Sequence, residues 1–288
     1  RDTEASRGLG DVYKRQFYGR LIRGVKNGPS PKWLQNRLRA IGLRPISTLV
    51  DITNFFTYDN NRPLHVFDAD KLIGTSIRVH DALGGEKFSA LDDKEYMLSK
   101  GMTVISDSEG IESLAGIMGG SASGCTDTTE NVFIEAAYFN PIRTAYTGRE
   151  LKINSDARYR FERGIDPEWT AFGIEAATKM IIELCGGEPS NVVQAGEIPN
   201  HGRAYKVDTA RIESLVGMAI PPHKQLNILE NLGFVIKGDT ASVPSWRPDI
   251  QGEADLVEEI ARVVSLTKLQ GIPLSLIHIS EPTRRLCI

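Results

Sequence analysis

The sequence has little cysteine and no long apolar run, and each absence excludes a class of protein. Only three cysteines occur in 288 residues (Cys125, Cys185 and Cys287), and their spacing fits neither a disulfide framework nor a metal site. No apolar run approaches the length of a membrane-spanning helix, and no signal-peptide pattern is present. We therefore expect a soluble protein of the reducing cytoplasm, without a membrane partner.

A strong excess of charge of one sign is also missing. The formal net charge is −3, and the hydrophobic and charged fractions of 41% and 25% are typical of a globular protein. This balance excludes an overall basic nucleic-acid-binding protein, so any basic surface must be local. Residues 1–16 and 275–288 show no sustained periodicity, and we interpret both as extraneous or disordered tails.

Between the tails, the pattern predicts an α+β fold in two domains. Residues 17–198 mix helical periodicity with short strand-like runs, including a hairpin across 102–115. Composition shifts at a linker near 198–202, which contains proline and glycine. Residues 199–274 then predict short helices and a hairpin, as in a helix-turn-helix-like module. No basic stripe lines its second helix, so we expect no DNA binding.

Three helices are predicted in enough detail to be tested. One begins with Ser30 as its N-cap and ends at Gly42. Its segment, 17–44, carries seven basic residues and no acid, which indicates either a solvated face or phosphate contacts. The other two follow Asp166-Pro167 and begin near Gly252. Their expected core positions are Phe172, Ala176, Met180 and Leu184 in the former, and Leu256, Ile260 and Val263 in the latter.

The stretch from 45 to 70 holds the first candidate site. Leu49, Ile52 and Phe56 share one helical face, and turn residues at 59–61 end that helix. Pro63 then leads the chain back, so that His65 returns near Thr53 and Asn54. By itself His65 is either a satisfied structural residue or part of a site.

Two further features lie downstream. Asn131–Phe139 predicts a strand in which Glu135 shares a face with Phe133, and a carboxylate among apolar residues is either an edge position or a site. Glycines cluster at 116–124 without a phosphate-loop pattern, which indicates close approach of the backbone to another strand or to a ligand.

Four acids, Asp249, Asp255, Glu258 and Glu259, surround the start of the last predicted helix. Acids at a helix N-terminus are favourable without any ligand. The same carboxylates would also suit a hard cation such as Mg²⁺. Spacing alone leaves both interpretations open.

Several stretches together resemble one family. VDITNFF and PLHVFDADKL are followed in order by MGG at 118–120, NVFIEAAYFNP at 131–141, SDARYRFERGIDP at 155–167 and VPSWRPDIQGEADLVEEIAR at 243–262. They resemble the beta subunit of bacterial phenylalanyl-tRNA synthetase, and the likeness covers roughly residues 17–274. It implies a tRNA-editing domain at 17–198 and a helix-turn-helix-like domain at 199–274.

The resemblance also implies an activity and its residues. The family's module hydrolyses the ester bond of tyrosine wrongly attached to tRNA(Phe). The positions that match its catalytic residues are His65, Thr53 and Asn54. The implied substrate-binding residues are Glu135, Gly119, Gly120, Ser155 and Ala157. Better-known members carry threonine where this chain has Ser155, so a methyl group is lost there.

The implied metal is Mg²⁺, shared with the alpha subunit and held by Asp249, Asp255, Glu258 and Glu259. The implied partners are tRNA(Phe) and the alpha subunit, in an assembly of two alpha and two beta chains. ATP would be a substrate of the full enzyme, not bound by this segment. Two alternatives stay open: a non-enzymatic assembly or RNA-binding module of the synthetase, and a free-standing aminoacyl-tRNA deacylase.

Overall fold

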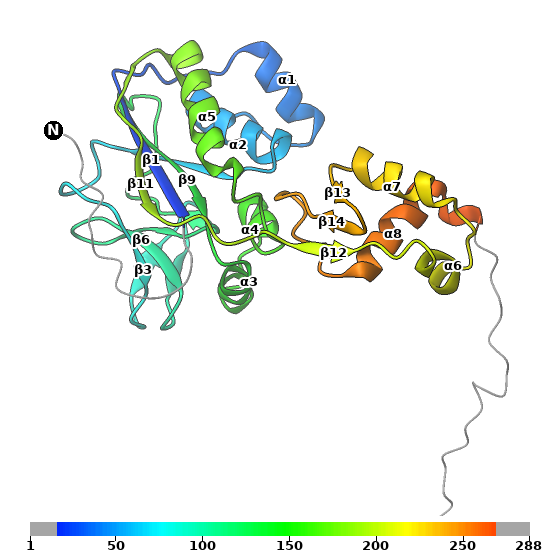
Figure 1. Cartoon of the computed structure of the whole chain (residues 1–288). Coiled ribbons are helices and arrows are strands. Elements are labelled where there is room, and N and C mark those ends of the chain that lie inside the picture. The colour runs from blue at the N-terminus through cyan, green and yellow to red at the C-terminus, as the bar shows by residue number, and fades with distance from the viewer. Residues whose placement is uncertain (1–15, 269–288) are drawn as a thin grey trace, which may run out of the picture. The chain divides into compact units, whose positions relative to one another are not determined.

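The computed structural model describes residues 16–268, and their elements confirm the α+β class (Figure 1). The chain divides into two compact units, with the boundary between His201 and Gly202. No helix within 16–268 is long and apolar enough to cross a membrane. Most of residues 1–16, and all of residues 275–288, lie outside the described residues. Gln16, which we assigned to a tail, is instead the fully buried first residue of a strand.

The first unit is built on a five-stranded antiparallel sheet. Its strands are β10 (Glu188–Pro189), β1 (Gln16–Arg23), β9 (Asn131–Tyr138) and β2 (Leu64–Asp68) in spatial order, with β11 (Val193–Gly196) also pairing with β1. The order places β9 in the interior and β2 at an edge. Side chains along β9 alternate as predicted, since Val132 and Ile134 join one core cluster and Phe133 joins another.

Three helices pack on the Val132 and Ile134 face of the sheet: α1 (Lys32–Ala40), α2 (Thr48–Asp59) and α5 (Trp169–Cys185) (Figure 1). Leu49, Ile52 and Phe56 are buried in this layer, which confirms the predicted face of α2. Its amphipathic spacing is therefore what fixes how α2 sits against the sheet.

Short strands and two helices build the rest of the first unit. One small sheet contains β3 (Arg78–Asp81), β6 (Thr103–Ser106), β7 (Ile111–Leu114) and β8 (Met118–Gly119), and β4 (Lys87–Ser89) pairs with β5 (Glu95–Met97). The β6–β7 pair confirms the predicted hairpin. Helices α3 (Pro141–Glu150) and α4 (Asp156–Phe161) follow β9.

Two helix predictions for the first unit were wrong in detail. Ser30 does not cap α1, because its hydroxyl donates to Oδ2 of the fully buried Asp51 at 2.5 Å. Phe172 on α5 is 67% exposed rather than in the core. The buried face of α5 includes Gly173 and Ala177, because small side chains let the helix approach the sheet and the buried Arg62 closely.

The second unit packs three helices on a three-stranded sheet. The strands are β12 (Ala204–Lys206), β14 (Thr240–Ser242) and β13 (Val235–Lys237), in that order. The helices are α6 (Arg211–Val216), α7 (Pro222–Asn231) and α8 (Glu253–Val264), and a 3-10 turn, η1 (Leu266–Lys268), follows. Leu256 and Ile260 are buried as predicted, whereas Val263 is exposed and Val257 and Ala261 take the core side instead.

Candidate functional site

A cavity of about 460 Å³ opens at the β2 edge of the large sheet. Its walls come from α2, β2, the turn between β7 and β8, and the start of α4. The residues that line the cavity include Thr53, Asn54, His65, Gly119, Glu135, Ser155 and Ala157. Seven of the eight residues predicted for the editing site therefore lie around one space, although they span more than a hundred positions of sequence.

Strand register places the two titratable groups of the cavity side by side. Glu135 of β9 is the Cα partner of His65 on β2, and on its other side it is the partner of Gly19 on β1. Directly paired residues project to the same face of a sheet. Glu135 and His65 therefore line the same cavity from adjacent strands.

His65 is packed tightly within this wall. Its ring meets the Phe67 ring edge-on, with 4.4 Å between centroids. A Cβ added to Gly119 would lie 2.3 Å from Cε1 of His65, so only glycine lets the β8 backbone approach the imidazole. Burial disfavours the charged imidazolium and lowers the pKa of His65 to about 4. The imidazole is therefore neutral at physiological pH.

Glu135 is the cavity residue with the least satisfied polar group. The residue is 5% exposed, and its Oε2 atom lies buried without a hydrogen-bond partner. Burial raises the pKa of Glu135 to about 8, so the carboxyl group holds a proton at neutral pH. The strand order rules out the alternative of an edge position, since β9 is paired on both sides.

The hydroxyl groups near the cavity are held by the backbone. Thr53 donates to the carbonyl of Val50 at 2.8 Å, one turn back along α2. Ser155 donates to the Ile117 carbonyl at 2.6 Å and accepts from the Arg158 amide as the N-cap of α4. Neither hydroxyl is bonded to a histidine, so the arrangement lacks an activated serine or threonine nucleophile among the residues described.

Gly120 is the predicted site residue that the cavity does not include. Its Cα faces the Glu112 carbonyl, which a Cβ would approach to 2.8 Å, and it forms an isolated bridge with Ala90. This glycine permits close strand packing behind the cavity wall. Its neighbour Gly119 carries the contact with His65.

Sequence reasoning missed Cys125 and Leu91, which also line the cavity. Cys125 reaches it because the loop at Ser123 accepts a backbone hydrogen bond from Asp68, at the end of β2. Burial raises the pKa of the Cys125 thiol to about 12, so it is not a thiolate nucleophile. No sequence motif marks either residue, because loop pairing alone brings them in.

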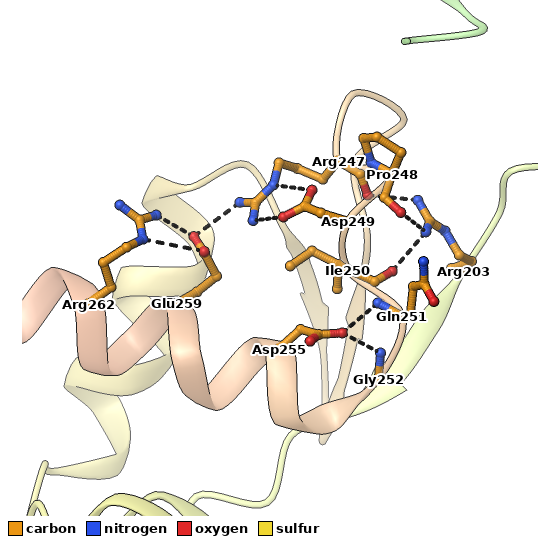
Figure 2. A network of polar contacts seen from close by, with 10 residues as sticks. All are labelled: Arg203, Arg247, Pro248, Asp249, Ile250, Gln251, Gly252, Asp255, Glu259 and Arg262. Atoms are coloured by element: carbon orange, nitrogen blue, oxygen red, sulfur yellow. Dashed lines mark hydrogen bonds and ion pairs between the residues drawn. The ribbon is translucent and has the colours of Figure 1, made fainter. Parts of the chain in front are cut away.

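In the second unit, three of the four predicted metal ligands, Asp249, Asp255 and Glu259, are bonded to different partners (Figure 2). Asp249 receives two hydrogen bonds from Arg247, at 2.8 and 2.6 Å, and the Arg247 guanidinium lowers its pKa. Arg247 and Arg262 both donate to Oε2 of Glu259, at 3.1 and 2.5 Å. Burial raises the pKa of Glu259, but these two arginines outweigh it and the net shift is downward.

The other two acids, Asp255 and Glu258, lie in different surroundings. Oδ2 of Asp255 accepts from the backbone amides of Gln251 and Gly252, at 2.6 and 2.9 Å, and so closes the N-terminus of α8 (Figure 2). Glu258 is exposed. Within residues 16–268, no three His, Cys, Asp or Glu side chains are grouped so as to hold a metal ion. As arranged here, the acids do not fit Mg²⁺, because arginine or backbone donors already bond three of the four.

Comparisons with known proteins agree with the motifs. Residues 13–186 match the family model of the B3/4 domain, and residues 205–265 match that of the tRNA synthetase B5 domain. Phenylalanine–tRNA ligase beta subunits of Ruegeria pomeroyi and Cereibacter sphaeroides are 66% and 64% identical over 258 residues. That of Mesorhizobium japonicum is 51% identical over 264 residues.

Each alignment covers 90% of this chain and 32% of the relative, so the chain spans about a third of the length of these relatives. The two matched domains follow the order of the two structural units. The chain belongs to the B3/4 domain family, and the resemblance of its motifs to the phenylalanine–tRNA ligase beta subunit is confirmed.

Proposed function

We propose that this chain is the part of a phenylalanine–tRNA ligase beta subunit that hydrolyses tyrosine wrongly attached to tRNA(Phe). The observation that carries the proposal is the buried Oε2 of Glu135, a residue that lines the cavity, because this atom has no hydrogen-bond partner. The phenolic hydroxyl of tyrosine would supply the missing donor. Phenylalanine would leave the oxygen unsatisfied, at a cost of about 1–3 kcal/mol.

The size and charge of the cavity support the same substrate. About 460 Å³ is within the range of sites that enclose small molecules. With a pKa of about 8, Glu135 is uncharged at neutral pH, and its carbonyl oxygen still accepts a hydrogen bond. Selection would then rest on a satisfied against an unsatisfied polar group. If Glu135 were ionised, phenylalanine would instead leave a buried charge without a partner.

The reaction is the hydrolysis of an ester. The oxygen of water attacks the carbonyl carbon, the bond to the ribose oxygen breaks, and the ribose oxygen takes up a proton as tyrosine leaves. Neutral His65 can accept a hydrogen bond from that water, with Asn54 as a second polar contact. A pKa of about 4 makes His65 a weak proton acceptor, so we assign it the positioning of water.

The remaining roles belong to the whole enzyme. We propose that the chain works beside an alpha subunit, in an assembly of two alpha and two beta chains in the cytoplasm. That assembly would charge tRNA(Phe) with phenylalanine at the expense of ATP. The acid-bearing segment of the second unit would meet Mg²⁺ only if the alpha subunit displaced the arginines that now hold Asp249 and Glu259.

A deacylation assay tests the proposal. The chain is mixed with tRNA(Phe) carrying radiolabelled tyrosine or phenylalanine, and the loss of each ester is followed. We expect the tyrosyl ester to disappear faster than in buffer and faster than the phenylalanyl ester. Loss of both esters at the buffer rate would favour the alternative of a non-enzymatic assembly module.

A further inference from the structure

Two arginine–tyrosine contacts involve α4 and the turn that follows it, next in sequence to residues that line the cavity. The guanidinium carbon of Arg160 is 4.3 Å from the ring centroid of Tyr58, and that of Arg163 is 3.6 Å from the ring centroid of Tyr159. Arginine over the face of an aromatic ring forms a flat, positively charged layer. Here two such layers belong to α4 and the turn that follows it.

Both contacts are tied to elements that line the cavity. Tyr58 is in the last turn of α2, whose Thr53, Asn54 and Thr57 are cavity residues. Arg160 donates to the backbone carbonyl of Asp156 at 3.0 Å, and Asp156 lines the cavity. Tyr58 and Arg160 therefore adjoin residues that line the cavity.

The second contact is open to solvent. Tyr159 is 53% exposed, and Arg163 is also more than half exposed. Arg163 is kept in place by the Tyr159 carbonyl, at 2.8 Å, and by Glu162, at 2.9 Å. Fixed side chains of this kind lose little freedom when a flat group stacks on them. Arg149 and Lys152 are exposed nearby in sequence and add positive charge.

We propose that Tyr159 and Arg163, next to the Tyr58–Arg160 contact in which Arg160 is 14% exposed, form a stacking platform for the unpaired 3′-terminal nucleotides of the aminoacyl-tRNA. The inference rests on the proposed function, because an ester inside the cavity must be followed outside it by its ribose and the next nucleotides. Single-stranded RNA is held by bases stacked on aromatic rings and guanidinium planes, with cations near the phosphates. The platform supplies both groups.

Binding of a short RNA tests the platform without any hydrolysis. The probe is a 5′-fluorescein RNA that ends in ACCA, and its anisotropy is measured with the 288-residue chain. Tyr159→Ala with Arg163→Ala should weaken binding by about tenfold or more, the loss expected for one stacked base. Tyr159→Phe should bind within about twofold of the parent, because the ring is kept. Arg163→Lys, which keeps charge and loses the planar stack, serves as a second variant if the double variant does not fold.

A matched control exists at another arginine–aromatic contact. Arg37 lies 6.0 Å from the Trp33 ring, on α1, and neither residue lines the cavity. Trp33→Ala with Arg37→Ala should change RNA binding by less than about threefold. That small loss is expected because one positive charge that attracts RNA without specificity is removed. An equal loss in both double variants, or none in Tyr159→Ala with Arg163→Ala, would overturn the platform.

A second arm separates this inference from the proposed function. The Tyr159→Ala, Arg163→Ala variant should raise the KM for Tyr-tRNA(Phe) and leave hydrolysis of tyrosyl-adenosine unchanged, since that ester lacks the other nucleotides. Equal slowing of both esters would contradict the platform. If the parent hydrolyses neither ester, the proposed function fails, and the RNA-binding arm still decides on the platform.

Discussion

The cavity of the first unit and the acid-bearing segment of the second unit differ in how far their polar groups are satisfied. In the cavity, the Oε2 atom of Glu135 is buried and unpaired. In the second unit, Asp249 and Glu259 are bonded by arginine, and Asp255 by backbone amides. Both regions were predicted to be functional sites from the same family resemblance.

The difference is between a buried polar group without a partner and groups that already have partners. A buried polar atom without a partner lowers stability, and a ligand that satisfies it recovers that free energy. An acid paired with arginine has already gained this stabilisation within the chain. By this criterion the cavity contains an acceptor without a partner, whereas the acid segment forms a network of bonded side chains within the chain.

The largest expected effect comes from breaking that network. Arg247→Ala leaves Glu259, whose side chain is 9% exposed, with one arginine instead of two, and removes the partner of Asp249. We expect a loss of about 3 kcal/mol in unfolding free energy, as for a partly buried ion pair that loses one member. Hydrogen exchange of α8 amides in the second unit measures it.

Arg211→Ala is the matched control, because it breaks the more exposed Arg211–Glu253 pair at the start of the same helix. We expect that change to cost less than about 1 kcal/mol. If both variants exchanged at the same rate, the network around Glu259 would contribute no more than a surface ion pair.

A smaller effect is expected from pH at Glu135 over the range from pH 6.5 to 8. The folded pKa of about 8 lies above the usual value of 4.5, so between these values the folded state holds a proton that the unfolded state has lost. Stability therefore falls as pH rises through this window, by about 1.4 kcal/mol per unit. The pKa of His65 is lowered from 6.5, so its titration changes the stability only below pH 6.5. The effect of Glu135 is therefore measured between pH 6.5 and 8.

Urea unfolding of the parent and of Glu135→Gln provides the comparison. The amide does not titrate, so the unfolding free energy of the variant should fall less steeply with pH. The difference in slope should be about 1.4 kcal/mol per pH unit over the same range. Parallel curves for the two proteins would mean that Glu135 is not held protonated by the fold.

The smallest expected effect is that of Mg²⁺ on the chain by itself. Because arginines and backbone amides bond three of the four acids, millimolar Mg²⁺ should shift the thermal midpoint by less than about 1 °C, as expected for a ligand far below its Kd. Differential scanning calorimetry measures it. A saturable rise that Asp255→Asn with Glu258→Gln abolishes would show a metal site that forms without the alpha subunit.

The sequence predicted elements whose periodicity is local. The face of α2 and the alternation along β9 follow from spacing alone, and the structure confirms both. Phe172 was misplaced because apolar residues surround much of α5. Which side packs inward depends on the close approach that Gly173 allows, and periodicity does not contain that information.

Site prediction was limited in the same way. The residues around His65 and Glu135 could be listed from motifs, but only strand register places these two side by side. Likewise, the spacing of the four acids does not reveal whether a cation or an arginine neutralises them. Arg247 lies twelve residues from Glu259 and reaches it because the segment before α8 folds back.

The rate of deacylation of Tyr-tRNA(Phe) against Phe-tRNA(Phe), measured for the parent, Glu135→Ala and His65→Ala, tests the central claim most directly. Glu135→Ala should slow tyrosyl hydrolysis and narrow the preference for tyrosine by about tenfold, because the acceptor for the phenolic hydroxyl is gone. His65→Ala should slow hydrolysis and leave the preference largely intact, since the imidazole would act at the ester. A Glu135→Ala chain that is folded and deacylates Tyr-tRNA(Phe) as fast and as selectively as the parent would contradict the account.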